Sequence, residues 1–167
     1  EAIRTNIKDS YRAGIEASAR VKIAGPLSWA VNATLSTTKV KDFHQFLQNY
    51  DTGTLDETQY KKTDIAYSPN FIGSSTISYH PVKNGEIAFI SKYVSRQYLD
   101  NTSTASRSLD AYMVNDVRLN YNFSIKGIKN VGVGLLVNNI FSKKYQSDGA
   151  TYPDIEGGQV MNYNYFF

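Results

Sequence analysis

The sequence predicts an all-β protein of antiparallel up-and-down strands, part of a large transmembrane β-barrel. Apolar and polar residues alternate with a period of two through most of the chain, which is the pattern of strands with one apolar face. Aromatic residues are frequent, with 13 Tyr, 8 Phe and 1 Trp, and aromatic girdles mark both interfaces of transmembrane barrels. The connections between the expected strands alternate between short and long, as they do in barrels with short turns on one side of the membrane.

The composition excludes several other classes of protein. The chain of 167 residues has no cysteine, which excludes a disulfide framework and a thiolate metal site. It also lacks the run of about 18 apolar residues that a transmembrane helix needs. The net charge of +3 comes from scattered lysines and arginines, so we expect no nucleic-acid partner. The two histidines, His44 and His80, lie far apart and form no set with serine and aspartate, so we expect no catalytic residues and no cofactor.

The first two strands follow from an unbroken alternation. From Tyr11 to Lys22 the odd-numbered residues are mainly apolar and the even-numbered ones mainly polar. The turn signal Ala24-Gly25-Pro26 interrupts this pattern, which resumes from Leu27 to Ser36. These segments predict two strands joined by a tight turn.

Four further strands are expected after a polar, irregular stretch at residues 39–64. Their approximate ranges are 65–79, 86–98, 113–123 and 131–137. Short turns at 81–85 and 126–130 alternate with long loops at 99–110 and 141–160. The connections therefore run short, long, short, long, short, long.

One face of these strands is apolar, and the other carries charged side chains with many serines and asparagines. In a barrel the apolar face meets lipid and the polar face meets a wet lumen. In a soluble β-sandwich the apolar face would be the core and the polar face would meet solvent. The periodicity does not separate these two interpretations.

Four segments resemble, in the expected order, motifs of the TonB-dependent outer-membrane receptors. The most specific is Val137–Tyr145 (VNNIFSKKY), which resembles the N-L-F-x-x-x-Y stretch that ends the penultimate strand of that family. The other three are Tyr11–Glu16 (YRAGIE), Ser68–Phe71 (SPNF) and Tyr93–Asp100 (YVSRQYLD). The resemblance implies structural roles for the motif residues Asn138, Asn139, Phe141 and Tyr145. The style of the loops is similar to receptors of the Bacteroidetes type.

The resemblance also implies an organisation. Residues 1–167 are expected to form part of the receptor's β-barrel domain, a C-terminal fragment that supplies about six or seven of about 22 strands. The family's plug domain and coupling peptide have no counterpart in this sequence. We expect the segment 162–167 to stop just before the family's final strand, although its alternating tyrosines also fit that strand itself.

The function implied by the resemblance is nutrient uptake across the outer membrane of a Gram-negative bacterium. The partners would be outer-membrane lipid, the TonB energy-coupling protein acting through a plug, and a small-molecule ligand. We expect a ferric siderophore or another iron complex, with a haem, cobalamin or glycan receptor of the same family as alternatives. A soluble β-sandwich that binds carbohydrate or protein, a passive porin and an outer-membrane enzyme also remain open.

The segment 41–62 is expected to be an outer loop that contributes to ligand capture or closes the outer mouth. It is longer than an ordinary connection and rich in aromatic residues. Its candidate ligand-binding residues are His44, Tyr50 and Tyr60. No metal ligands are assigned, since Asp148, Asp154 and Glu156 share one loop but do not fit the spacing of an EF-hand.

Overall fold

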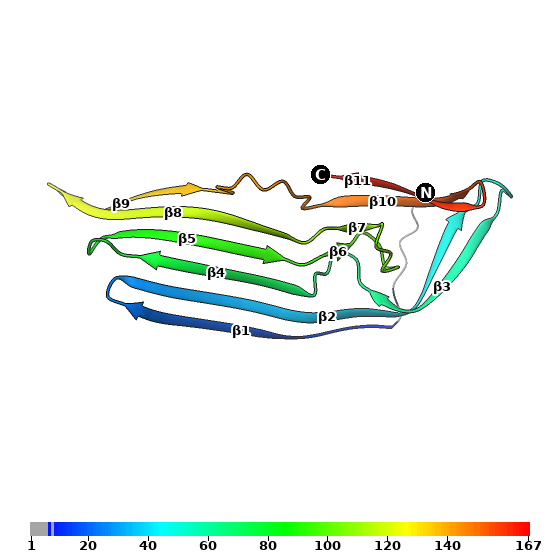
Figure 1. The fold of residues 1–167 in the computed structure, drawn as a ribbon, viewed down its shortest axis with the longest axis horizontal. Coiled ribbons are helices and arrows are strands. Elements are labelled where there is room, and N and C mark those ends of the chain that lie inside the picture. The colour runs from blue at the N-terminus through cyan, green and yellow to red at the C-terminus, as the bar shows by residue number, and fades with distance from the viewer. Residues whose placement is uncertain (1–6, 8) are drawn as a thin grey trace.

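The computed structural model describes residue 7 and residues 9–167, and its regular elements are all β-strands (Figure 1). The strands are β1 (Ser10–Ala24), β2 (Leu27–Gln48), β3 (Leu55–Asp64), β4 (Phe71–Tyr79), β5 (Gly85–Val94), β6 (Gln97–Tyr98), β7 (Ser108–Leu109), β8 (Tyr112–Ile125), β9 (Ile128–Val137), β10 (Gly149–Glu156) and β11 (Gln159–Phe166). The described residues contain no helix of the length and apolarity that a membrane crossing requires. The predicted all-β class is confirmed.

Seven strands form one open sheet. Its order is β1-β2-β4-β5-β8-β9, and β3 pairs with the distal half of β2. Every pair is antiparallel and the main strands follow one another in chain order, which is the predicted up-and-down topology. Strands β1 and β9 lie at opposite edges of the sheet (Figure 1). Two smaller sheets, β10-β11 and β6-β7, lie beyond one end of it.

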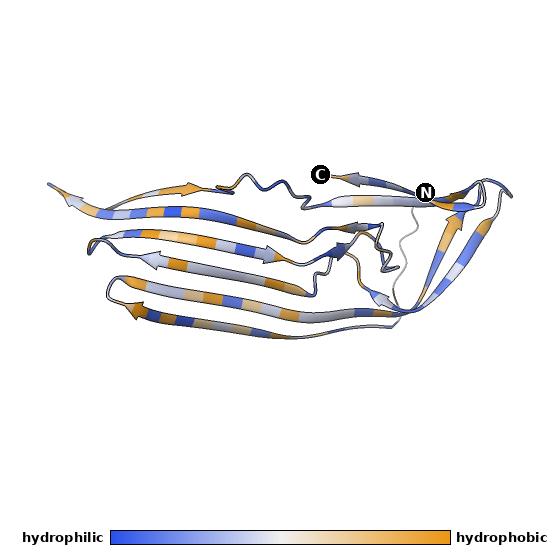
Figure 2. Cartoon of the chain, viewed as in Figure 1, coloured by the Kyte–Doolittle hydropathy of each residue, from blue (hydrophilic) through white to orange (hydrophobic). Residues whose placement is uncertain are grey.

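The register of the sheet collects its apolar side chains on one face, which we call the apolar face. One row of cross-strand partners runs across all six long strands through Val21, Trp29, Ile77, Phe89, Val117 and Val137. The opposite, polar face carries residues such as Lys22, Ser28, Ser78 and Arg118 in the neighbouring row. Figure 2 shows the resulting alternation of hydropathy along the strands.

The apolar face is uncovered. On it, Ile15 is 71% exposed and Leu35 is 60% exposed. Within the described residues no second sheet packs on this face, because the small β10-β11 sheet meets the main sheet near the distal end of β2. The architecture is therefore a single open sheet and differs from the β-sandwich that the periodicity had left open.

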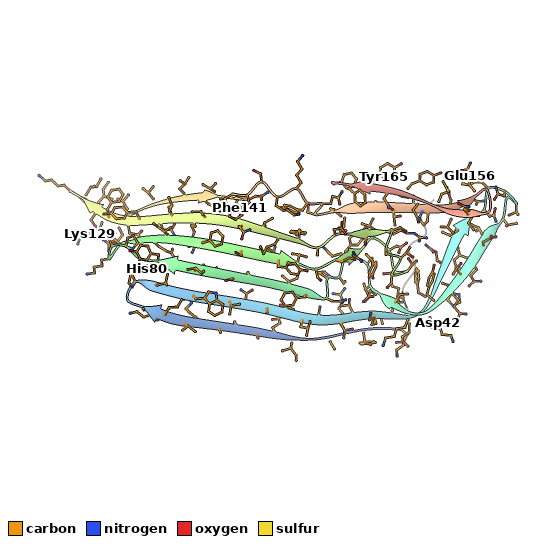
Figure 3. All side chains as sticks on the ribbon, in the orientation of Figure 1. Asp42, His80, Lys129, Phe141, Glu156 and Tyr165 are labelled. Atoms are coloured by element: carbon orange, nitrogen blue, oxygen red, sulfur yellow. The ribbon has the colours of Figure 1, made fainter. Side chains whose placement is uncertain are left out.

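The predicted alternation of connections is confirmed. Turns at residues 25–26, 80–84 and 126–127 all lie at one end of the sheet, which we call the short-turn end. Gly25 and Gly127 adopt φ angles of 47° and 87° there, and glycine reaches this left-handed region without steric cost. Figure 3 shows His80 and Lys129 at this end and Asp42 and Glu156 toward the other, the long-connection end.

The stretch 39–64, predicted to be irregular, is instead a β-hairpin. Strand β2 continues to Gln48 and pairs with β3, and the next strand begins at Phe71 rather than near residue 65. Both faces of this hairpin carry Lys, Gln, Thr and acidic residues, so no apolar period of two marks its strands. Asp42, with a φ of 52°, lies where β2 bends away from the main sheet (Figure 3).

Two further boundaries were wrong. The predicted loop 141–160 contains β10, which forms a hairpin with β11, so residues 162–166 pair with β10 and not with the main sheet. Pro153 argues against a strand in the sequence, but proline is tolerated at sheet edges and bulges. The predicted strand 86–98 ends at Val94, and Gln97–Tyr98 pair with Ser108–Leu109.

Most buried side chains lie at the long-connection end, not in the main sheet. Val40, Leu47, Leu99 and Leu109 are each at most 5% exposed. They belong to residues 40–64 and residues 97–109, and a third segment, residues 149–166, contacts both. We call these segments the loop assembly. The long connections therefore form a packed structure with its own small core.

Candidate functional site

The loop assembly joins segments that are far apart in the sequence. Asn49 forms an isolated parallel bridge with Ile155, and the backbone N–H of Tyr50 donates to the Ile155 carbonyl at 2.9 Å. Asn164 Nδ2 donates to the Ser106 carbonyl at 2.7 Å. The β2-β3 hairpin, the 97–109 segment and the β10-β11 hairpin are thus held in contact across the long-connection end.

Arg107 is the central buried charge of the loop assembly. The residue is 3% exposed, and its Nη1 atom lies 2.7 Å from the Asp100 carboxylate. Its Nε donates to Asn162 on β11, and Asp100 also accepts from the Thr102 hydroxyl at 2.6 Å. A buried charge is tolerated only when it is paired and hydrogen-bonded. Arg107 therefore ties the 97–109 segment to β11.

Asp51 at the tip of the β2-β3 hairpin binds the turn of the β10-β11 hairpin. Gly157 and Gly158 both have positive φ angles, 60° and 71°, which is the geometry of a type I′ turn. Their backbone N–H groups donate to the two Asp51 carboxylate oxygens at 2.9 and 2.7 Å. These hydrogen bonds hold the pKa of Asp51 below its usual value, and the bond from Gly158 has the larger effect.

Replacing Asp51 with asparagine should loosen this contact. A lowered carboxyl pKa stabilises the docked state above the ordinary pKa of about 3.9, and that stabilisation is lost as the pH falls through the folded value. We expect faster amide exchange of Gly157 and Gly158 in the variant at neutral pH, and in the unsubstituted protein only under acid. Exchange measured by mass spectrometry on the peptide around residues 156–160 tests this, with Glu57→Gln as the control. Unchanged protection in Asp51→Asn would show that the Asp51 carboxylate does not hold the β10-β11 turn in place.

His44 lies in strand β2 of the loop assembly and not in a loop as predicted. Its Nδ1 is bonded to the Glu57 carboxylate across the hairpin, and its Nε2 is 3.5 Å from Asp42. The hydrogen bond with Glu57 is the largest cause that raises the pKa of the imidazole, and the charge of Asp42 adds to it. His44 is thus part of an exposed acid–base cluster at the bend of β2.

Tyr60 and Tyr50 do not join His44 in one pocket. Tyr60 is the cross-strand partner of Phe43, whereas His44 is the partner of Gln59, so the register places Tyr60 and His44 on opposite faces of the hairpin. The Phe43 and Tyr60 ring centres are 6.3 Å apart. Tyr50 lies in the hairpin turn and is 67% exposed. The three candidates therefore lie at three different places on one hairpin: His44 on one face, Tyr60 on the other face and Tyr50 at the tip.

The motif residues span the wall of the sheet. Asn139 has a φ of 49° and closes a turn through Oδ1, which accepts from the Lys143 N–H at 2.9 Å, and Nδ2, which donates to the Lys143 carbonyl at 3.0 Å. Phe141 lies against Phe89 of the apolar face, with ring centres 6.5 Å apart. Tyr145 stacks on Tyr112 at 4.3 Å, and the register places Tyr112 on the polar face. Asn138 precedes this turn and makes no side-chain hydrogen bond within the described residues.

An open cleft lies beside the stacked tyrosines. It has a volume of about 270 Å³ and is lined by Asp110, Tyr112, Lys143, Lys144 and Tyr145, among others. Aromatic ring faces and ammonium groups together suit a planar or anionic ligand. Within the part of the chain that the structure describes, no three His, Cys, Asp or Glu side chains gather closely enough to hold a metal ion.

Sequence reasoning missed Arg107 and Asp51. The Gly157-Gly158 doublet is a recognisable turn signal, but nothing near it points to a carboxylate 106 positions away. Arg107 lies in a Ser/Thr/Asn-rich segment that was predicted to be a plain loop. Both contacts arise only when separate hairpins meet.

The comparisons with known proteins agree with this architecture. Residues 2–140 match the family model described as TonB dependent receptor-like, beta-barrel. No curated protein and no solved structure matched the chain.

Proposed function

The chain belongs to the TonB-dependent receptor-like β-barrel family, and we propose that it forms part of the wall and outer mouth of a receptor that imports a scarce nutrient. This is a family of outer-membrane receptors and transporters, not of enzymes. We assign residues 1–167 to the barrel domain and expect energy coupling to reach it through a plug that contacts the TonB protein. The Bacteroidetes type remains a prediction from the loops.

The observation that supports this proposal most is the uncovered apolar face opposite a polar face. In hydrocarbon, every backbone N–H and C=O group needs a hydrogen-bond partner within the protein. Antiparallel strands that close into a barrel provide these partners. The apolar face would meet lipid and the polar face would line a wet lumen. Because periplasmic turns of such barrels are short, the loop assembly would face the outside.

We propose that the loop assembly captures the nutrient and narrows the outer mouth. A ferric siderophore or another iron complex fits the cleft beside Tyr112 and Tyr145, where Lys143 and Lys144 offer positive charge to an anionic chelate. His44, Tyr50 and Tyr60 remain the candidate contacts on the β2-β3 hairpin. Haem, cobalamin and oligosaccharides are the alternative nutrients.

Shortening the β2-β3 hairpin tests the role in capture. Phe43 and Tyr60 are direct cross-strand partners, so a two-residue Asn-Gly turn can join them in place of residues 44–59. We expect the receptor that carries this change to fold and insert, but to bind its nutrient at least about tenfold more weakly, a loss of about 1.4 kcal/mol. Binding would be measured with a panel of ferric catechol and hydroxamate chelates, haem, cobalamin and oligosaccharides.

A matched control places the same turn sequence at the other end of the sheet. Lys126→Asn creates an Asn-Gly turn at the short-turn end, far from the loop assembly, and should leave binding unchanged. Equal binding by the shortened receptor and the unsubstituted one would contradict capture by the hairpin. Binding of an oligosaccharide or cobalamin alone would keep the receptor role and replace the iron complex.

A further inference from the structure

Two lysines converge on one tyrosine ring at the long-connection end of the apolar face. Tyr11 pairs with Lys39 and lies in the same alternating series as Ile15. Lys41 and Lys62 are cross-strand partners on the adjoining hairpin. Their Nζ atoms lie 5.9 and 5.6 Å from the centre of the Tyr11 ring. Two ammonium groups are therefore held beside a single aromatic side chain.

The neighbouring carboxylates leave this cluster positive. Asp64 is committed to Lys39, at 2.6 Å, with both side chains largely buried. Asp9 approaches Lys41 at 3.5 Å, but both side chains are at least half exposed, and such surface pairs are weak. Among the described residues, no carboxylate lies within salt-bridge distance of Lys62. The two ammonium groups over Tyr11 are thus available to a further anion.

The position of the cluster identifies the kind of anion. Just inward of it, on the same face, lie Ile15 and its cross-strand partner Leu35, both strongly exposed. Tyrosine is enriched at the boundary between hydrocarbon and water, where headgroups lie. Lysines close to an anionic membrane surface attract its headgroups. A ligand here would meet an apolar surface on one side and ammonium groups on the other.

We propose that Tyr11, Lys41 and Lys62 form a binding site for the phosphate of an anionic lipid headgroup in the outer leaflet. The acyl chains of that lipid lie along the apolar face below, and its phosphate accepts hydrogen bonds from the two lysines. This site rests on the proposed assignment of the apolar face to lipid. The site lies at the base of the β2-β3 hairpin, next to the apolar face.

The test uses the complete receptor that contains this chain, purified in mild detergent. Native mass spectrometry measures how much phosphatidylglycerol or phosphatidylcholine it retains. Lys41→Gln with Lys62→Gln should lower retention of phosphatidylglycerol by about tenfold or more and leave phosphatidylcholine unchanged. The matched control Lys61→Gln removes a neighbouring exposed lysine whose register position is on the other face of β3, and it should change neither.

A second variant keeps the test independent of folding. Lys41→Arg with Lys62→Arg preserves both charges and should retain phosphatidylglycerol. Equal retention by the double glutamine variant and the unsubstituted receptor, or equal retention of the two lipids, would overturn the proposal. Displacement of the lipid by an equal concentration of inorganic phosphate would also overturn it, since the cluster would then be a free-phosphate site. Nutrient binding by the unsubstituted receptor is measured in parallel, so a failure of the receptor proposal would be seen separately.

Discussion

Replacing Leu119 with arginine should lower the free energy of unfolding of the barrel by about 2–4 kcal/mol. Leu119 lies on the apolar face near the middle of β8, between its partners Ile87 and Leu135. A guanidinium there would be forced into hydrocarbon, where a charge is most costly at the midplane of the membrane. The measurement is reversible folding of the complete barrel into lipid vesicles over a denaturant series.

The adjacent residue provides the control for this prediction. Asn120 points to the polar face, where its Nδ2 donates to Glu86 at 2.9 Å. Arginine at this position can pair with the same carboxylate in a wet lumen, so Asn120→Arg should cost much less than Leu119→Arg. Equal costs at the two positions would mean that the apolar face does not meet lipid.

Replacing Arg107 with leucine should destabilise the loop assembly by about 3–5 kcal/mol. The substitution leaves the Asp100 carboxylate largely buried without its cation and removes the hydrogen bond to Asn162. The remaining bonds from Thr102 to Asp100 place the expected cost toward the lower end of this range. Amide exchange of residues 97–109 and 159–166 would report the local opening.

A second arginine allows a direct comparison. Arg96 contacts Asp110 at 3.7 Å, with both side chains more than half exposed. Because exposed pairs contribute about 0–1 kcal/mol, Arg96→Leu should barely change the exchange rates. If Arg107→Leu were equally mild, the loop assembly would be held by its apolar contacts, with no central role for the buried charge.

The sequence by itself determined the wall. The alternation around Tyr11–Lys22, Leu27–Ser36 and residues 113–137 predicted strands, turns and faces that the structure confirms, because each strand has one apolar and one polar face. In such a strand a register slip of one residue would expose the wrong face, so the pattern specifies the pairing as well as the strand. The VNNIFSKKY segment, residues 137–145, pointed to the family whose model matches residues 2–140.

Only the tertiary structure decided the long-connection end. The hairpin β2-β3 was predicted to be irregular because polar residues occupy both of its faces and leave no periodic signal. Strand β10 was predicted to be part of a loop, and the alternating tyrosines of β11 did not show that it pairs with β10. Their contacts join Asp51 to Gly157 and Gly158, and Arg107 to Asp100 and Asn162. Such hydrogen bonds form between specific atoms of distant segments. The local sequence around one partner gives no indication of the other partner. The alternation of an amphipathic strand depends only on neighbouring residues. The packing of the loop assembly depends on where the folded sheet places the ends of its strands.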